Sequence, residues 1–144
     1  MIQKATKEDA KTIAKLAVLM WEDHSVADLA SEFSKILSQN DALILLKYEN
    51  DIPVGFAQCQ LRYDYVEGTK TSPVGYLEGI FILEKYRNKG YAKALLNVCE
   101  MWAKEKGCIE FASDCEIDNA GSFGFHQAMD FIEANRIICF TKEL

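Results

Sequence analysis

The sequence predicts an α+β fold in which a single mixed β-sheet is flanked by helices. Antiparallel strand patterns dominate the first half of the chain, and a strand–helix–strand unit follows in the second half. The helical segments carry apolar residues at the spacing of amphipathic helices. The chain has 144 residues and is 49% hydrophobic. That size favours a single domain, residues 1–144, built around one apolar core.

The first half is expected to contain one strand, two helices and a hairpin. Thr6 is a plausible N-cap for the first helix and Ser25 for the second. The turn signal Glu49-Asn50-Asp51 separates the two hairpin strands. The expected elements are a strand at Met1–Ala5, a helix from Thr6 toward Trp21, a helix from Ser25 to Leu37, and strands at Ala42–Tyr48 and Val54–Tyr65.

The second half is expected to alternate strands and helices. Gly107 marks the end of the longest helix, because glycine commonly terminates helices. The expected elements are a strongly apolar strand at Val74–Leu83, a helix at Gly90–Lys106, a strand at Cys108–Cys115, a helix at Asn119–Met129, and a final strand or hairpin at Phe131–Lys142.

Composition excludes several classes of protein. The net charge of −6 argues against a nucleic-acid binder, and it is compatible with a cationic substrate or simply with solubility. No segment approaches the ~20 apolar residues of a membrane span, and the first residues lack a signal peptide, so a cytoplasmic protein is expected. The five cysteines form no C-x-x-C pair and never cluster with the two histidines, so no metal is expected.

The segment between the apolar strand and the longest helix has the features of an anion site. Arg87, Lys89 and Lys93 surround the start of the helix, where the macrodipole already places positive charge. A bound anion resolves this conflict, because free N–H groups at a helix start can hold a diphosphate. Gly90 and Ala92 would allow its close approach. The alternative is an ordinary surface turn with solvated charges.

The run Arg87-Asn88-Lys89-Gly90-Tyr91-Ala92 resembles the Q/R-x-x-G-x-G/A signature of the GNAT N-acetyltransferase superfamily. The element order resembles the GNAT fold over essentially the whole chain. The resemblance implies acetyl-CoA as co-substrate, with its pyrophosphate on the backbone amides of residues 88–92. It also implies that Ile80-Phe81-Ile82 pairs with the pantetheine arm and that Asn119 contacts the same arm.

Two carboxylates are candidates for the acceptor side. A protonated amine must lose a proton before it attacks a thioester, and a carboxylate is the expected general base. Glu78 lies within an apolar strand, where a carboxylate is costly unless it is paired or faces a cleft. Asp114 ends the next strand and begins a small acidic cluster with Glu116 and Asp118. An edge or surface-facing position for Glu78 and a turn-forming role for Asp114 at the strand end are the alternatives.

Longer stretches resemble a narrower family, the aminoglycoside 6'-N-acetyltransferases. They are Tyr63 to Gly75, Leu77-Glu78-Gly79-Ile80, Glu110 to Asp114, and Trp21 followed by Glu22 and Asp23. The resemblance implies that Trp21, Glu22, Tyr65, Glu78 and Asp114 bind an aminoglycoside, a polycationic amine. The alternative for Trp21 is a core anchor that ends the first helix.

His126 takes the position at which many GNAT enzymes carry a tyrosine that protonates the departing thiolate. Imidazole titrates near neutrality, so His126 is a candidate catalytic residue. A thiol with a pKa near ~8.5 also leaves unaided, and in that case His126 only packs.

Three functions therefore remain open. They are an aminoglycoside 6'-N-acetyltransferase that confers antibiotic resistance, a GNAT enzyme for another amine such as a polyamine or a protein N-terminus, and a non-catalytic acyl-CoA sensor. The resemblance also suggests a homodimer. The apolar run Ile137-Ile138-Cys139-Phe140 could supply an interface strand, or it could equally form an interior strand.

Overall fold

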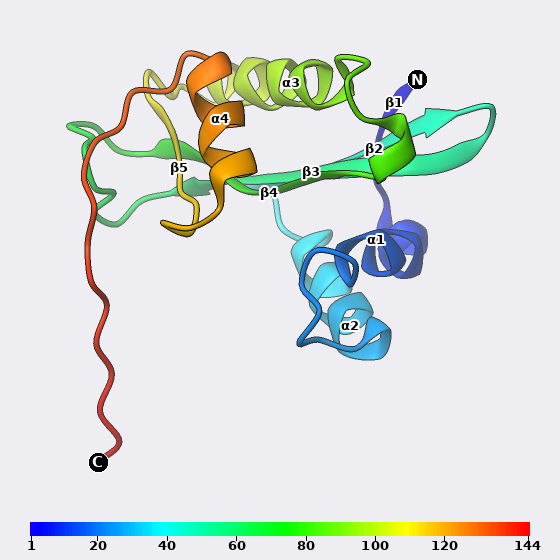
Figure 1. Ribbon diagram of the computed structural model, residues 1–144, viewed down its shortest axis with the longest axis horizontal. Helices are drawn as coiled ribbons and strands as arrows, with labels where there is room; N and C mark the ends of the chain where they lie inside the picture. The colour runs from blue at the N-terminus through cyan, green and yellow to red at the C-terminus, as the bar shows by residue number, and fades with distance from the viewer.

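A five-stranded sheet lies at the centre of the structure, a computed structural model that describes residues 1–144 (Figure 1). The strands follow chain order across the sheet, and the first four pair antiparallel, whereas the last two pair parallel. This mixed sheet confirms the predicted α+β class. The strands are β1 Ile2–Lys4, β2 Ala42–Glu49, β3 Ile52–Arg62, β4 Val74–Ile82 and β5 Phe111–Ser113.

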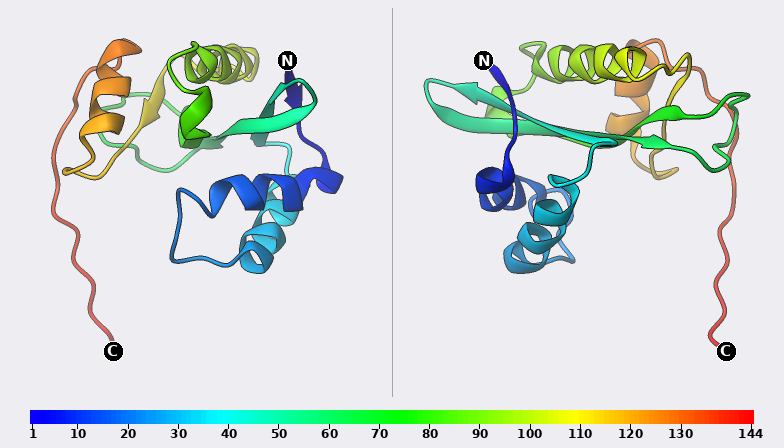
Figure 2. Two further views of the ribbon diagram at one scale, coloured as in Figure 1. Left: turned by 45° about the vertical axis from the view of Figure 1, so that its right-hand side comes forward. Right: turned by 180° about the vertical axis from the view of Figure 1, so that it is seen from behind.

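Helices cover both faces of the sheet. Figures 1 and 2 show α1 and α2 on one face and α3 and α4 on the other. None of the helices has the length and apolarity needed to cross a membrane. The helices are α1 Ala10–Ala17, α2 Val26–Ile36, α3 Tyr91–Glu105 and α4 Ala120–Ala128, with 3-10 turns η1 Lys7–Asp9 and η2 Glu84–Tyr86.

An aromatic cluster holds α2 against the sheet. Phe33 of α2 and Phe56 of β3 are almost fully buried, and their rings meet edge to face with centroids 6.1 Å apart. The Trp21 ring stacks on Phe33 at 6.4 Å and meets Phe56 at 6.2 Å. Aromatic pairs in this range add to the stability that burial provides. Trp21 is therefore an anchor of this core, as one of its two predicted roles requires.

A second core lies between α3 and the opposite face of the sheet. Leu95 and Cys99 of α3 are fully buried in the same cluster as Ala57 and Cys59 of β3. A hydrogen bond between the Cys59 and Cys99 thiols, together with burial, raises the pKa of Cys59, so its side chain stays neutral. The cysteines in this core thus act as small apolar residues.

The first helix is shorter than predicted. The Thr6 N–H donates to the Asp9 carboxylate at 2.8 Å, and the chain makes a 3-10 turn before α1 begins at Ala10. After Ala17 the chain continues in tighter turns, in which Leu19 N–H donates to Leu16 O and Met20 N–H to Ala17 O. Helix ends commonly tighten in this way, and the apolar spacing alone does not reveal it.

The predicted final strand or hairpin at Phe131–Lys142 is wrong, since residues after 130 form no strand. The tail contacts the molecule as far as Arg136: Asn135 Nδ2 donates to Glu67 Oε1 at 3.0 Å, and the Arg136 guanidinium lies 5.9 Å from the centroid of the Phe123 ring. Beyond this point the tail runs away from the molecule (Figure 2). Ile138 and Phe140 are 80% and 88% exposed. An apolar run forms a strand only where another strand offers it an edge, and this chain brings none to the tail. The interior-strand alternative is wrong for the same reason.

Truncation of a buried leucine should test how much the α1–α2 core contributes. Leu29 is 2% exposed, so Leu29→Ala is expected to lower the free energy of unfolding by about 2–5 kcal/mol in a urea titration. Leu19→Ala removes the same atoms from a side chain that is 53% exposed, and it should cost about 1 kcal/mol or less. Equal losses for the two variants would contradict the placement of this core.

Candidate functional site

Early termination of the β4–β5 pairing opens the sheet. The two strands pair over three residues only, from Gly75↔Phe111 to Leu77↔Ser113. Beyond Leu77, β4 continues to Ile82 and pairs with β3 alone. Backbone groups on the β5 side of this stretch have no strand partner, which leaves them available to an extended ligand. Ile80, Phe81 and Ile82, the predicted contacts for a pantetheine arm, line this gap.

Glu78 occupies a β-bulge at the same point. The register between β3 and β4 passes from Cys59↔Leu77 to Gln58↔Gly79, so Glu78 has no residue opposite. A bulge redirects a side chain and strengthens the local twist. The Glu78 side chain is 14% exposed, which rules out the surface position considered as an alternative.

Arg62 of β3 neutralises Glu78. Its Nε donates to Glu78 Oε1 at 3.0 Å and its Nη2 donates to Oε2 at 2.9 Å, which makes a bidentate ion pair. The same guanidinium lies 3.4 Å from the centroid of the Tyr76 ring. The pair explains how β4 tolerates a carboxylate among apolar residues, because each charge is matched and hydrogen-bonded.

Tyr76 links this ion pair to Asp114. Its hydroxyl donates to Asp114 Oδ2, while Oδ1 makes no hydrogen bond within the chain. Burial, reinforced by the bond to Asp114, raises the pKa of Tyr76, which therefore remains a neutral donor. Asp114 thus combines a positioned oxygen with an open one. Glu78 and Asp114, predicted from different strands, are brought together by Arg62 and Tyr76.

The turn before α3 has the backbone shape of an anion site. Asn88 and Gly90 have φ angles of +63° and +80°, and Gly90 is the N-cap of α3 without a side-chain cap or an acidic residue in the first turn. The first N–H groups of the helix therefore lack an internal partner. A Cβ built on Gly90 would meet no atom within 4 Å, so packing does not require glycine here, whereas the left-handed φ favours it.

Side chains of this turn are held by neighbouring strands. Arg87 Nε donates to Ile82 O at 2.8 Å, and Lys89 Nζ lies 3.4 Å from Glu49 Oε1 of β2. The Tyr91 hydroxyl donates to the same Glu49 oxygen, which lowers the pKa of Glu49 and raises that of Tyr91. These contacts fix the shape of the turn and leave its backbone N–H groups to bind a ligand.

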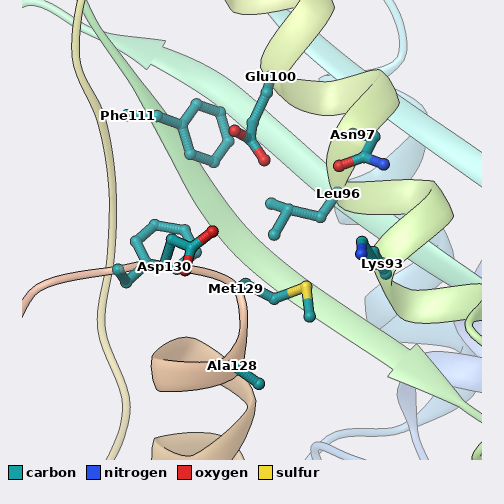
Figure 3. Close-up of a pocket in the computed structure, with 9 residues that line it drawn as sticks. Lys93, Leu96, Asn97, Glu100, Phe111, Ala128, Met129 and Asp130 are labelled. Carbon is teal, nitrogen blue, oxygen red and sulfur yellow. The ribbon is translucent and has the colours of Figure 1, made fainter.

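A cavity of about 310 Å³ lies between α3 and α4. Figure 3 shows Lys93, Asn97 and Glu100 of α3 on one side and the end of α4 with Asp130 on the other. The cavity therefore runs along α3 from Lys93 to Glu100 and reaches Phe111, the first residue of β5. Its lining residues are Lys93, Leu96, Asn97, Glu100, Phe111, Ala128, Met129, Asp130 and Phe131.

His126 of α4 is bound through both ring nitrogens. Nδ1 lies 2.7 Å from Ser122 O, and Nε2 lies 2.7 Å from Ser113 Oγ. A carbonyl oxygen can only accept, so Nδ1 carries a proton. The rings of Phe125 and Phe131 flank the imidazole, with centroids 5.7 and 5.1 Å away. His126 is thus positioned by specific contacts rather than by packing alone.

The other predicted residues make no hydrogen bond to Glu78, Asp114 or His126. Asn119 is the N-cap of α4, and its Oδ1 accepts from Ser122 N–H at 3.0 Å, so only its Nδ2 is left for a ligand. Tyr65 is 78% exposed, and its hydroxyl donates to Glu67 Oε2 at 2.8 Å. Glu22 is exposed and makes no side-chain contact. Their roles toward a substrate stay predictions.

Three residues of the site were not predicted. Arg62 and Tyr76 join the two carboxylates, and Ser113 contacts His126. The spacing of Tyr76 and Glu78 on one strand and the adjacency of Ser113 to Asp114 were available signals. The position of Arg62 depends on the β3–β4 register, which one-dimensional patterns specify poorly.

Comparisons with known proteins identify the family of the chain. The model of the acetyltransferase (GNAT) family matches residues 7–131. A protein of Acinetobacter genomosp. 13 named aminoglycoside N(6')-acetyltransferase type 1 is 44% identical over 90% of this chain and 88% of its own length. A protein of the same name from Acinetobacter baumannii is 42% identical over the same shares of both chains.

Solved structures extend the similarity to the whole chain. The 6'-N-acetyltransferase AAC(6')-IG of Acinetobacter haemolyticus is 35% identical, with a TM-score of 0.95 over 100% of this chain and 99% of its own. AAC(6')-Iy, in complex with a bisubstrate analogue of coenzyme A and acetylneamine, is 33% identical, with a TM-score of 0.94 over 100% and 98%. The chain belongs to the acetyltransferase (GNAT) family, in the branch that contains the aminoglycoside N(6')-acetyltransferases.

Proposed function

We propose that this protein transfers the acetyl group of acetyl-CoA directly to the 6'-amino group of aminoglycosides and thereby confers resistance to them. The observation that carries the proposal is the gap between β4 and β5. An anion-binding turn lies on the α3 side of the sheet, and the carboxylates Glu78 and Asp114 lie near the gap with Tyr76 and Arg62. The relatives' named activity supports the choice of substrate.

The residues present fit coenzyme A. The backbone N–H groups of residues 88–92 would hold its pyrophosphate, and the unpaired edge of Ile80–Ile82 would pair with its pantetheine arm. Lys93 and the cavity between α3 and α4 lie along the same route. When bound, the coenzyme supplies an activated acetyl thioester, and the protein supplies orientation and proton transfer.

Asp114 is the residue that we assign as the base. Protonation of Glu78 would break its ion pair with Arg62, so Glu78 is a poor proton acceptor and serves to attract ammonium groups. Asp114 has a neutral partner in Tyr76 and keeps Oδ1 open. It can take a proton from the acceptor ammonium, directly or through water, so that the neutral amine attacks the acetyl carbon.

The proposal also covers the extent of the catalytic domain and the cellular location of the protein. All elements assemble on one sheet, so residues 1–144 are taken as one catalytic domain. None of the five cysteines is paired, which favours a reducing compartment such as the cytoplasm.

We also propose that the protein is a homodimer in which the C-terminal tail of one copy packs on the other. The tail leaves its own molecule after Arg136 and exposes Ile137, Ile138 and Phe140. Covering these side chains removes apolar surface from water, and a second copy is the partner always present.

The activity is tested with a thiol-release assay on acetyl-CoA with kanamycin and tobramycin, beside the polyamines spermidine and putrescine. Expected results are turnover of the aminoglycosides, a product acetylated at the 6'-amine by mass spectrometry and NMR, and resistance of cells that express the protein. Turnover of polyamines alone, or binding of acetyl-CoA without turnover of any amine, would contradict the proposal.

Removal of the base should lower the rate of the chemical step. Asp114→Asn keeps the shape but loses the proton acceptor, so kcat is expected to fall by about 10²–10⁴-fold. Asp118→Asn is the matched control, because its side chain belongs to the same acidic cluster and makes no hydrogen bond. A near-normal kcat in Asp114→Asn, measured at saturating acetyl-CoA, would refute the assignment of Asp114.

A methyl group on Gly90 should weaken coenzyme binding. Gly90→Ala places a Cβ where the pyrophosphate approaches, so the Kd for coenzyme A, measured by calorimetry, is expected to rise at least about tenfold. Gly107→Ala is the matched control, since Gly107 lies at the other end of α3 with φ +92° and equally open surroundings. Both variants place an alanine at a left-handed φ and therefore share the same backbone strain. An equal loss of coenzyme A affinity in the two variants would mean that this strain, and not a contact between the new Cβ and the pyrophosphate, weakens binding.

A charge on the tail should separate the two copies. The native protein is expected to sediment at twice the 16.3 kDa of one chain, and Ile138→Asp at the mass of a monomer. Ile109→Asp changes an equally exposed isoleucine outside the tail and should stay dimeric. A native protein that sediments as a monomer at micromolar concentration would disprove the dimer.

A further inference from the structure

Ser113 and His126 form a hydrogen-bonded pair where the β4–β5 pairing ends. Ser113 is the final residue of β5 and lies opposite Leu77, where the gap between the strands begins. Its hydroxyl is 2.7 Å from His126 Nε2. The pair therefore lies at the open end of the sheet, where a thioester threaded along β4 would end.

Alternation along β5 places the pair and Asp114 on opposite faces of the sheet. Ser113 contacts α4, whereas Asp114 contacts Tyr76, which packs with Val66 and Val74 on the face away from α3. Gly75, the neighbour of Tyr76, faces Ala103 of α3, which fixes the two directions. A proton acceptor and a second proton-carrying group thus flank one gap from opposite sides.

The hydrogen bonds of His126 allow a proton to move through Ser113. Nδ1–H donates to Ser122 O, so Nε2 is the nitrogen that exchanges a proton with the Ser113 hydroxyl. In the imidazolium form Nε2–H donates to Ser113 Oγ, and the Ser113 O–H, which has only a long contact of 3.5 Å to Leu77 O, can turn to donate into the gap. With this arrangement His126 can act through Ser113 without touching the ligand; the direct role of His126 stays a prediction.

We propose that Ser113 is a catalytic residue that protonates the departing coenzyme A sulfur, and that His126 is the positioning residue that supplies the proton. The proposal rests on the proposed acetyl transfer but not on the identity of the amine. It identifies a proton path on the coenzyme side, separate from Asp114.

The acceptor nitrogen forms a bond to the acetyl carbon, the carbon–sulfur bond breaks, and its electron pair stays on sulfur. The Ser113 O–H gives its proton to sulfur while Oγ takes the proton of His126 Nε2. His126 ends neutral, with Nδ1–H still on Ser122 O, and regains a proton from solvent. Asp114 releases the proton of the acceptor ammonium to solvent before the attack, and it then takes the second proton, which the acceptor nitrogen loses as the amide forms.

Charged groups around the pair are few. Asp114 is adjacent to Ser113 on β5, and Asp130 precedes Phe131, whose ring lies against His126. Lys93 and Glu100 of α3 line the cavity that Phe131 also lines. None of these side chains makes a hydrogen bond to His126, so Ser113 is the only side-chain hydroxyl within 3 Å of it.

The test compares Ser113→Ala, His126→Gln and Ser113→Thr with the native protein over a range of pH. Because an imidazolium must supply the proton, native kcat should fall at high pH, and Ser113→Ala and His126→Gln should lose that limb. Their kcat is expected to drop about 10–100-fold with the KM for acetyl-CoA unchanged. Ser113→Thr keeps a hydroxyl and should retain at least half of the rate. Gln127→Ala, an exposed neighbour on α4, is the control.

A second readout does not depend on turnover. The ionisation of bound coenzyme A thiol is followed by the ultraviolet absorbance of its thiolate. A hydroxyl that donates to sulfur favours the thiolate, so Ser113→Ala should raise the apparent pKa of the bound thiol by about one unit. The measurement needs no amine, so it still decides the proposal if the acceptor is not an aminoglycoside.

The results expected with and without the proposed proton relay differ. Loss of the high-pH limb together with the shift in thiol ionisation supports the relay. A Ser113→Ala protein that folds, keeps kcat within about twofold and leaves the thiol ionisation unchanged overturns it. If His126→Gln unfolds, Ser113→Ala and Ser113→Thr decide the question alone.

Discussion

The three-residue ladder between β4 and β5 is the constraint on which the site depends. It is held closed at one end by Gly75, where any Cβ would lie 2.6 Å from the Phe111 ring and 2.7 Å from Ala103. Glycine at this position lets β5 and α3 approach β4 closely, and Gly75 N–H donates to Glu110 O at 3.1 Å. Nothing comparable holds the strands together past Leu77, so the sheet opens there. A longer ladder would close the gap and leave the ligand without a backbone edge.

The same opening separates two kinds of electrostatic environment. The turn before α3 offers N–H groups and cations, while Glu78 and Asp114 offer carboxylates on the other side of β4. Coenzyme A is polyanionic and the proposed acceptor, an aminoglycoside, is polycationic, so each would be attracted to its own face and repelled by the other. The reacting atoms meet only at the gap. Direct transfer without an acetyl-enzyme follows from this layout, because no cysteine or serine needs to carry the acetyl group across.

Local patterns predicted the elements well where packing agrees with them. The hairpin of β2 and β3, the apolar β4 and the amphipathic α3 all follow from periodicity and turn residues, and each is found within a few residues of its predicted ends. Gly90 and the cations of its turn predicted an anion site for a physical reason, the unsatisfied start of a helix. Asp114 was predicted from its place at a strand end.

What could not be predicted depends on contacts between distant residues. Arg62 and Glu78 meet because of the β3–β4 register and a bulge, and neither feature leaves a local signature. His126 reaches Ser113 because α4 packs beside β5, so a pattern that identified the histidine could not identify its partner. The prediction for the C-terminal tail was wrong for the opposite reason. The residues from Ile137 to Phe140 have a high β-propensity, which predicts a strand. A strand also needs the edge of a neighbouring strand to pair with, and the isolated chain offers none to the tail.

The Arg62–Glu78 ion pair allows two carboxylates with different proposed roles to lie in one site. Two unpaired carboxylates near one another and partly buried would repel, and one of them would tend to take up a proton. Arg62 removes that conflict by matching the charge of Glu78, and the Tyr76 hydroxyl satisfies Asp114 without neutralising it. The two acids therefore differ in role because their partners differ. In the proposed mechanism Glu78, paired with a cation, attracts the ammonium groups, and Asp114, with its open oxygen, accepts the proton of the amine.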